Sequence, residues 1–470
     1  MSAEPVAPPL AGAVSGDRAE QRATGGAAIL AAHVARSARE RLGEPVRRAA
    51  KAVLLHNLIV GLAAHGMPLP GLSESRALPW AERPVTAPDL AFATTLRMGA
   101  RAQHDEHPRS VTHLGSAVTP AVLAVAPRDI DGERLLAAIA AGYQVGGALG
   151  VALLPHVRAR GMRATGVVGP IASAAAVAAV MRLDAAAASD AIALAANRAA
   201  GYTEVWLEGT DEWRLQTAAA ARDGLESALW AAGGARGATA AIEGRSGLLH
   251  ALGVDAECGA AIVGALPGAL GGEPVIAQML LKAHPVCAIN QAAVEVAIGL
   301  RRELSDADLS TVERVVVRLS DADAAYPGID RAHPPSSWAQ AMMDARQGVA
   351  IALADGRVDA AALHPGSAEA QRLRALVDVV GGRPASAAHG AAIEIELADG
   401  RRLERASDGV EVDRARSARM ALELLPAAGL PTELAEQLPA LVDGIDGAGG
   451  VARLVDALDG IAPWEALCRR

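Results

Sequence analysis

Apolar residues recur at every third or fourth position through most of the first half of the chain, the spacing that gathers them on one face of an α-helix. This pattern predicts helices over residues 29–42, 44–66 and 88–102, and two longer helical segments over 131–154 and 165–202. The longer segments are dense in alanine and glycine, whose small side chains let helices approach closely. No heptad repeat with charged flanks is sustained, so we expect a compact helical bundle rather than a coiled coil.

The periodicity changes in the second half of the chain. Residues 315–319 and 389–398 have the β-branched or alternating pattern of strands, and the second strand ends in a turn at Asp399-Gly400. Residues 256–272, rich in glycine, alanine and proline, precede this region and predict a connection between the two halves. Helices are also predicted in this region, over residues 294–302, 337–353 and 369–380.

Helical periodicity returns near the end of the chain, from residue 412 onward. The sequence therefore predicts a mainly α protein. It consists of a helical region over 25–268, an α+β region over 269–405 and a final helical segment over 406–470. Residues 1–24 carry acidic residues and prolines where a secretory signal needs a basic end and a long apolar core, so we expect a disordered lead-in there.

Composition narrows the class of protein. A chain of 470 residues with 51% hydrophobic residues can fill sizeable cores. Its three cysteines, Cys258, Cys287 and Cys468, are far apart and lack CxxC spacing, which argues against a disulfide framework or a zinc ribbon and favours a reducing compartment such as the cytoplasm. A net charge of −9 and only 2% aromatic residues argue against a nucleic-acid surface. Apolar runs such as 171–180 end before the ~20 residues that span a bilayer, so no membrane span is expected.

A glycine cluster at Gly146, Gly147 and Gly150 resembles a dinucleotide-binding loop only superficially. No predicted strand precedes it, and no acidic residue follows at the distance that the ribose contact requires. We therefore reject a Rossmann-type site.

The densest group of ionisable residues lies over 103–126, with His104, Asp105, Glu106 and His107 in a row and His113 ahead of an apolar run. Four such groups cannot all be buried without strongly shifted pKa values, so they belong on a surface or in a cleft where protons are exchanged. A solvated loop and an active-site loop are both compatible with this pattern.

The segments around these residues favour the active-site loop. The segment THLGSAVTPAVLAVA, preceded by the acidic and histidine-rich loop, resembles the HPG/HPS-containing segment of the MmgE/PrpD family. Further similar segments follow in the same order: GYQV at Gly142, RGMRATGVVGPIASAAAVAA from Arg160, GTDEWRLQTAAAARDGL from Gly209, IEGRSGL from Ile242, KAHPVC from Lys282 and YPGID from Tyr326. Their order and spacing together carry the resemblance.

The resemblance implies a fold and a chemistry. Members include 2-methylcitrate dehydratase, cis-aconitate decarboxylase and iminodisuccinate epimerase, which need no cofactor and move a proton on carbon next to a carboxylate. The implied fold is a large all-helical domain built from both chain ends, a smaller α+β domain between them, a cleft at their junction, and a homodimer. Such a site needs a base, an acid and cations that hold a small anionic carboxylate substrate.

The resemblance also assigns roles to residues. His113 matches the family histidine and is the expected acid–base group, because imidazole titrates near neutral pH. Asp105, beside Glu106, matches an acidic pair that orients this histidine or shares its proton. Lys282 matches a lysine suited to a substrate carboxylate or an enolate-like intermediate, and Tyr326 matches a tyrosine that donates a proton.

The chain departs from the family pattern at several of these motifs. Arg163 stands where a histidine is common, and the segment beginning Trp213-Arg214 keeps the arginine of its motif but loses the lysine and the histidine. Arginine is no base at neutral pH but binds carboxylates bidentately, so Arg163 and Arg214 are expected to bind the substrate. Substrate contacts are also expected from the three remaining candidates, His104, His107 and His284, the last of which replaces a tyrosine.

Several functions remain open from the sequence. A lyase of the dehydratase type is the leading hypothesis, and an epimerase or isomerase fits the loss of acid groups because no hydroxide then needs a proton as it leaves. The sequence is also compatible with a decarboxylase and with a catalytically silent helical binding protein. His104, His107 and His113 could in addition form a metal-dependent hydrolase, but HxxH alone is a weak ligand signal, so no metal is expected.

Overall fold

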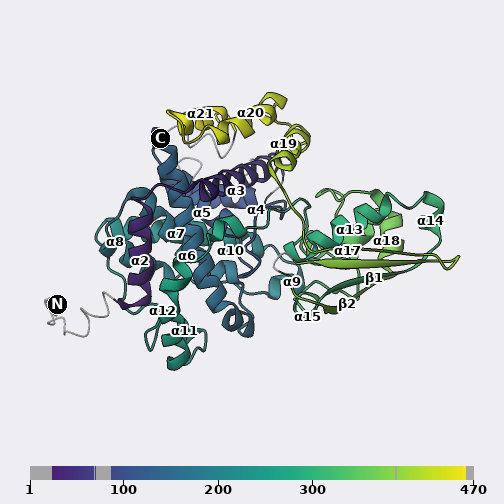
Figure 1. Cartoon of the computed structure of the whole chain (residues 1–470), viewed down its shortest axis with the longest axis horizontal. Helices are drawn as coiled ribbons and strands as arrows, with labels where there is room; N and C mark the ends of the chain where they lie inside the picture. Colours follow the sequence, from purple (N-terminus) through teal and green to yellow (C-terminus); the bar gives the residue numbers. More distant parts are fainter. Residues whose placement is uncertain (1–23, 68, 70–85, 387–388, 462–470) are drawn as a thin grey trace, which may run out of the picture.

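The computed structural model describes residues 24–67, 69, 86–386 and 389–461. Figure 1 shows two parts, a large bundle of helices and a smaller part in which helices cover a β-sheet. The predicted lead-in, up to residue 23, lies outside the described residues.

The bundle is formed by helices from the first 270 residues. They are α2 (Gly26–Ser37), α3 (Glu44–Leu62), α4 (Ala87–Gly99), α5 (Leu114–Val125), α6 (Gly132–Ala159), α7 (Ala164–Met181), α8 (Ala185–Ala196), α9 (Glu204–Glu208), α10 (Glu212–Ala232), α11 (Leu248–Ala251) and α12 (Ala256–Leu270). Helix starts follow the local sequence. Thr86 and Asp89 form a capping box at α4, and the Asp131 side chain accepts from the Glu133 amide at α6.

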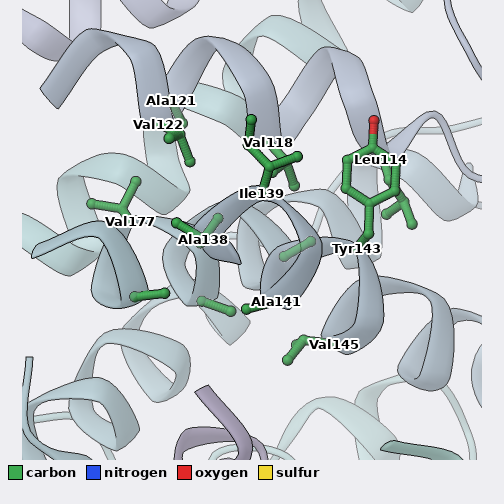
Figure 2. Close-up of a cluster of buried hydrophobic side chains, with 14 of the residues drawn as sticks. Leu114, Val118, Ala121, Val122, Ala138, Ile139, Ala141, Tyr143, Val145 and Val177 are labelled. Carbon is green, nitrogen blue, oxygen red and sulfur yellow. The ribbon is translucent and has the colours of Figure 1, made fainter. Parts of the chain in front are cut away.

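Helices α6 and α7 lie at the centre of the bundle and pack closely against each other. A Cβ atom at Gly142 would lie 2.7 Å from the Ala176 Cβ and 2.9 Å from the Ala172 carbonyl oxygen, so this contact requires glycine. Figure 2 shows how Val118, Ile139 and their neighbours interdigitate here. By length and composition alone both helices could cross a membrane, but 89% and 94% of their apolar windows are buried inside the protein, as in core helices.

The predicted connection over residues 256–272 is wrong, because the segment forms helix α12. The Asp255 side chain accepts from the Cys258 amide at 2.8 Å and caps the first turn. The helix-forming tendency of its alanines then outweighs the unfavourable effect of its glycines. The helix also contains Pro267, which lies on its exposed outer face.

The smaller part contains a four-stranded mixed sheet of order β2-β1-β3-β4. Strand β1 (Val312–Ser320) pairs in parallel with β2 (Val377–Arg383) and antiparallel with β3 (Ala391–Leu397), which pairs antiparallel with β4 (Arg402–Ser407). The helices of this part are α13 (Gln291–Arg301), α14 (Asp306–Ser310), α15 (Asp321–Ala324), α16 (Trp338–Met343), α17 (Ala345–Asp355) and α18 (Ala368–Arg374), with the short 3-10 turn η2 (Ala288–Asn290). A second 3-10 turn, η1 (Val275–Gln278), precedes them and packs on α3 and α6 of the bundle. Helix α13 packs against β3 and β4, and α17 packs against β2.

Two predicted helices of this part are corrected. The helix predicted over 369–380 ends at Arg374, and β2 follows because Val377 and Val379 pair with Val315 and Val317 of β1. The helix predicted over 337–353 is broken at Asp344, whose extended backbone ends α16 and whose side chain caps α17.

The last helices return to the bundle. Helices α19 (Arg414–Ala427) and α20 (Thr432–Asp443) pack on α3, with α21 (Gly450–Ala457) beyond them, as Figure 1 shows at its upper edge. Met420 and Leu438 belong to the same buried cluster as the N-terminal helices. The ammonium group of Lys51 on α3 completes this contact, donating to the Asp443 carbonyl and to the Asp446 carboxylate, both at 2.7 Å.

Candidate functional site

A cavity lies between the loop that leads into α5 and the first segments of the smaller part. The space between its atoms is about 490 Å³, part of which is open to solvent. Its lining combines ionisable side chains with tryptophan, methionine and small residues: Ala102, His104, Glu106, Val111, His113, Arg163, Trp206, Trp213, Lys282, Cys287, Ala288, Ile289, Tyr326, Met342 and Met343. Apolar walls with a few convergent polar groups are typical of small-molecule sites.

Backbone contacts fix the loop that carries the histidines. The Glu106 amide donates to the Leu280 carbonyl at 2.9 Å, and the Leu280 amide donates back at 2.8 Å, so the loop is paired with the segment that leads to Lys282. The His113 amide donates to the Thr165 hydroxyl oxygen at 3.0 Å. Residues from three distant parts of the sequence therefore meet here.

The loop that carries the histidines is buried, so it is not the solvated loop that the sequence left open. His104, Asp105, Glu106 and His107 are all at most 3% exposed. Burial lowers the pKa of His104 well below its usual value and raises the pKa of Asp105 to about 6. The four groups are buried together because the histidines are neutral and both carboxylates have polar partners.

His113 has the geometry of a general base. Its Nδ1 lies 3.1 Å from the Asp105 carbonyl oxygen and 3.4 Å from Glu106 Oε2. Both neighbours are acceptors, so we assign the proton to Nδ1, which leaves the Nε2 lone pair free. Burial, together with the positive charges of Lys282 and Arg163, keeps the pKa of His113 well below its usual value, so the imidazole is neutral.

His104 lies next to His113 in the cavity. The two rings meet edge to face with centroids 4.2 Å apart. Neither ring nitrogen of His104 has a hydrogen-bond partner among the described residues, although the side chain is almost completely buried. A neutral imidazole in this state offers one donor and one acceptor to a bound molecule.

Lys282 and Arg163 supply positive charge. Lys282 is 1% exposed, and burial lowers its pKa to about 8. Burial also lowers the pKa of Arg163 to about 10, and its guanidinium donates to the Trp213 carbonyl and stacks on Trp206 with its carbon 5.1 Å from the ring centroid. Within the described part of the chain neither cation forms an ion pair, so both are available to an anion.

Asp105 does not line the cavity. Its carboxylate accepts from the Gly115 amide at 3.0 Å and from the Tyr143 hydroxyl at 2.6 Å, behind the start of α5. Only its carbonyl oxygen reaches His113. The carboxylate that faces His113 belongs to Glu106, the other member of the predicted acidic pair.

Three predicted substrate-binding residues point elsewhere. His107 contacts the Ser110 hydroxyl through Nδ1 at 2.7 Å, and burial lowers its pKa to about 4. His284 Nε2 lies 2.7 Å from Glu295, which also pairs with Arg416 of α19. Arg214 pairs with Asp211 at 2.7 Å and stacks on Trp213 and Trp338. The histidine set that could have held a metal is therefore not assembled, and no group of three or more potential ligands occurs in the described residues.

Tyr326 lines the cavity from the smaller part. Burial raises the pKa of its phenol, which therefore stays protonated and can donate a proton or a hydrogen bond. Tyr326 and Val111 also line a second, adjoining cavity together with Arg158, whose guanidinium carbon lies 5.4 Å from the Tyr326 ring centroid. Arg158 is exposed, so it presents positive charge beside the cavity.

Backbone strain is concentrated at this site. Four non-glycine residues among those described have positive φ, and Arg182 ends a helix. The other three are at the site: Ala102 (φ 55°) and Val111 (φ 52°) line the cavity, and His389 (φ 52°) contacts Glu106. A β-branched residue such as Val111 rarely adopts this conformation, and such outliers cluster at functional sites.

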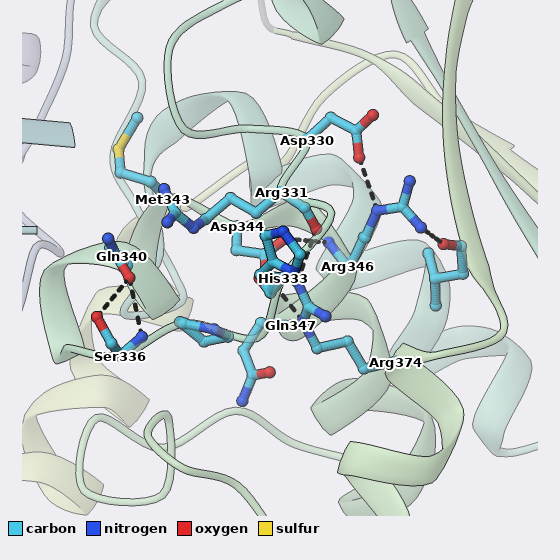
Figure 3. Close-up of polar contacts among 12 residues, drawn as sticks. Asp330, Arg331, His333, Ser336, Gln340, Met343, Asp344, Arg346, Gln347 and Arg374 are labelled. Atoms are coloured by element: carbon cyan, nitrogen blue, oxygen red, sulfur yellow. Dashed lines mark hydrogen bonds and ion pairs between the residues drawn. The ribbon is translucent and has the colours of Figure 1, made fainter. Parts of the chain in front are cut away.

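A buried ion pair supports the wall formed by Met342 and Met343. Figure 3 shows Asp344, the next residue, between Arg374 and the start of α17. The Asp344 carboxylate accepts from Arg374 at 2.7 and 3.0 Å, and Arg374 also donates to the carbonyls of Arg331 and His333. This network ties the wall to the segment that follows Tyr326.

Sequence reasoning missed several residues of the site. Trp206, Trp213 and Cys287 form its walls, and burial raises the pKa of Cys287 to about 12, so its thiol is neutral. His389 and Asp323 add charged groups from the smaller part. In the sequence, the only signal for His389 is its position at the start of a predicted strand. This position does not indicate which residues the side chain contacts.

Comparison with known families gives two matches. The model of the MmgE/PrpD N-terminal domain matches residues 28–259, and the model of the MmgE/PrpD C-terminal domain matches residues 284–414. Together they cover more than three quarters of the chain. No curated protein sequence matches it.

Proposed function

The chain belongs to the MmgE/PrpD family, and from that premise we propose that it is a cofactor-independent enzyme that moves a proton on carbon next to a carboxylate of a small di- or tricarboxylate. Membership supports an enzyme of the dehydratase or epimerase kind. The observation that carries the proposal is a cavity in which two buried cations, Lys282 and Arg163, lie beside the neutral imidazole of His113 and have no ion-pair partner among the described residues.

The substrate's negative charge would complete the site. A buried ammonium group and a buried guanidinium group favour a ligand that carries carboxylates, because an ion pair between each cation and a carboxylate is stronger away from water. Binding would also offset the positive charges that depress the pKa of His113. The imidazole therefore becomes a stronger base when the substrate is present.

In the proposed step, His113 Nε2 takes the proton from the carbon next to a carboxylate. The electron pair of the C–H bond moves toward that carboxylate, and Lys282 and Arg163 stabilise the enolate-like intermediate. The electron pair then forms a C=C bond as the C–O bond on the neighbouring carbon breaks, and Tyr326, protonated at neutral pH, gives its proton to the leaving hydroxyl group, which departs as water. This balance describes a lyase of the dehydratase type.

An epimerase is the second candidate. The acid–base groups His113 and Tyr326 come from different parts of the fold and line one cavity. If Tyr326 gives its proton to the carbon rather than to a leaving group, the same residues invert the configuration at that carbon. The neutral Cys287 thiol in the cavity is a third proton donor that either reaction could use.

Proton NMR in heavy water tests the proposal. Purified protein is incubated with citrate-like, aconitate-like and amino-dicarboxylate acids, beside His113→Asn and, as a matched control, His250→Asn, which changes an exposed histidine on α11. New vinylic signals indicate a lyase, and deuterium entering next to a carboxylate without loss of substrate indicates an epimerase. The His250 variant should behave as the wild type. Exchange that survives His113→Asn would refute the role of His113, and no exchange with any acid would favour a silent binding protein.

The proposal includes the quaternary structure and the compartment that the resemblance and composition suggest. We propose a homodimer in the cytoplasm, in which free Cys258 and Cys287 remain reduced. Light scattering of the purified protein should give twice the monomer mass of 47.7 kDa. A monomer at micromolar concentration would contradict this assembly.

A further inference from the structure

His389 links the smaller part of the fold to the histidine loop. It lies just before β3 and is 6% exposed. Its Nδ1 lies 2.9 Å from Oδ1 of Asp323 in α15, and its Nε2 lies 3.4 Å from Oε1 of Glu106. One imidazole is therefore held between two buried carboxylates from different parts of the protein.

This arrangement favours the charged form of His389. Burial alone would lower the pKa, but the hydrogen bond to Asp323 and the pairing with Glu106 outweigh it and raise the pKa of His389 to about 9. The imidazolium and the two carboxylates together carry one net negative charge. The exposed guanidinium of Arg158 acts on Asp323 from outside.

We propose that His389 is a positioning residue for catalysis: as an imidazolium, it holds the Glu106 carboxylate in place beside His113, so that Glu106 and the Asp105 carbonyl together keep the proton on Nδ1 and leave Nε2 as the base. This inference rests on the proposed function of His113. It goes beyond it by assigning a role to a residue that touches neither the cavity nor the substrate.

The geometry supports a continuous relay. The two oxygens of Glu106 are used separately, since Oε1 faces His389 and Oε2 faces His113, each at 3.4 Å. Neither Oε1 nor the His389 Nε2 that faces it has a hydrogen-bond partner among the described residues, so their contact is an ion pair. The backbone of Glu106 is fixed by its pairing with Leu280, so a change at His389 acts on the carboxylate rather than on the loop.

Other charged groups surround this carboxylate. Besides the two histidines, electrostatic interactions reach Glu106 from four ionisable residues of the cavity: Lys282, Arg163, Tyr326 and Cys287. The first two remain positive with or without His389 below about pH 8. Loss of His389 therefore weakens the stabilisation of the carboxylate without removing it, and the expected effect is a shift in pH dependence rather than complete loss of activity.

The backbone suggests the best variant. His389 has a φ of 52°, a conformation that glycine adopts without strain. His389→Gly should therefore keep the fold, which circular dichroism checks, and leave a space that free imidazole can enter. Glu106→Gln and Asp323→Asn remove one carboxylate each, and His250→Asn on α11 is the control.

The first measurement does not depend on activity. In ¹⁵N-histidine NMR, the signal missing from His389→Gly identifies His389. It should stay protonated to about pH 9 in the wild type and titrate at least about one pH unit lower in Glu106→Gln. A wild-type signal that titrates near or below 6.5 would overturn the proposal.

The second measurement uses the proton-exchange assay. In His389→Gly, kcat should fall about tenfold at pH 7 with KM little changed, and the acidic limb of the pH–rate profile should move up by about one unit, because the positive charge that faces the Glu106 carboxylate is lost. Added imidazole should restore both. A uniform fall at every pH without rescue would mean a structural role only and would overturn the proposal. If the wild type exchanges no proton with any acid, the proposed function fails, and the histidine titration alone decides whether His389 is the imidazolium that holds Glu106.

Discussion

Replacing Lys282 with methionine should make the protein more stable and inactive. Lys282 is buried and forms no ion pair with any residue in the described part of the chain, and burial lowers its pKa from 10.5 to about 8. Each unit of pKa shift corresponds to about 1.4 kcal/mol, so the buried ammonium costs about 3 kcal/mol at pH 7. Methionine has a similar length and carries no charge. Lys282→Met should therefore raise the free energy of unfolding by up to about 3 kcal/mol.

The extra stability of Lys282→Met over the wild type should decrease as pH rises. The folded pKa of Lys282 lies below the unfolded value, so between pH 8 and 10.5 the unfolded state holds more protons and the wild type gains stability as pH rises. Below pH 8 both states are protonated, and the whole penalty is present. The difference between variant and wild type should fall from about 3 kcal/mol at pH 7 to about 1.4 kcal/mol at pH 9.5.

Urea denaturation followed by circular dichroism at these two pH values measures the difference. Lys51→Met is the matched control, because Lys51 is partly exposed and paired with Asp446, and its loss should not stabilise the protein. The sequence contains only these two lysines, so ¹³C-lysine NMR gives two signals, of which that of Lys282 should titrate near pH 8.

Two results would refute the reasoning on Lys282. One is a variant no more stable than the wild type at pH 7, and the other is a stability difference that does not change with pH. In the functional assay, Lys282→Met should lose proton exchange although it is the more stable protein. If Lys282→Met retained proton exchange, the buried charge of Lys282 would not be needed for substrate binding.

Three further predictions concern the surroundings of the site. Asp344→Ala should lower the free energy of unfolding by about 3–5 kcal/mol, measured by urea denaturation, because Arg374 is left buried and unpaired. Gly115→Ala should lower it by at least about 1–3 kcal/mol in the same assay, because its Cβ would collide with buried polar groups around the Asp105 carboxylate. Arg158→Gln should lower kcat/KM for an anionic substrate severalfold with kcat unchanged, and added salt should remove the difference between the two enzymes.

The helical bundle could be predicted from the sequence because most of its helices have their own apolar periodicity. Helix α12 was missed for a local reason, its alanine content and its Asp255 cap, whereas the other two errors occurred where a distant segment decided the local structure. Residues 377–383 became β2 through pairing with β1, more than fifty residues earlier, and nothing in the segment itself names that partner. The break at Asp344 has a similar origin, since the buried Arg374 holds its carboxylate.

The candidate site shows the same limit. His113, Lys282, Arg163 and Tyr326 were identified from motifs and line one cavity. The positions of His107, His284 and Arg214 depend on partners that no motif contains, among them Ser110, Glu295 and Asp211. Residue type and spacing suggested what these side chains could do, but their contacts decide which way they point.

The distribution of charge explains why the site needs both parts of the fold. The helical part supplies the imidazoles and Glu106, whereas Lys282 follows the isolated bridge between Leu280 and Glu106, and the counter-ion His389 precedes β3. Without the smaller part, Glu106 would lose its contact with His389, although Arg163 of the helical part would still act on it. For the proposed proton transfer, contacts between the two parts such as that of Glu106 with His389 would therefore be constraints on function as much as on stability.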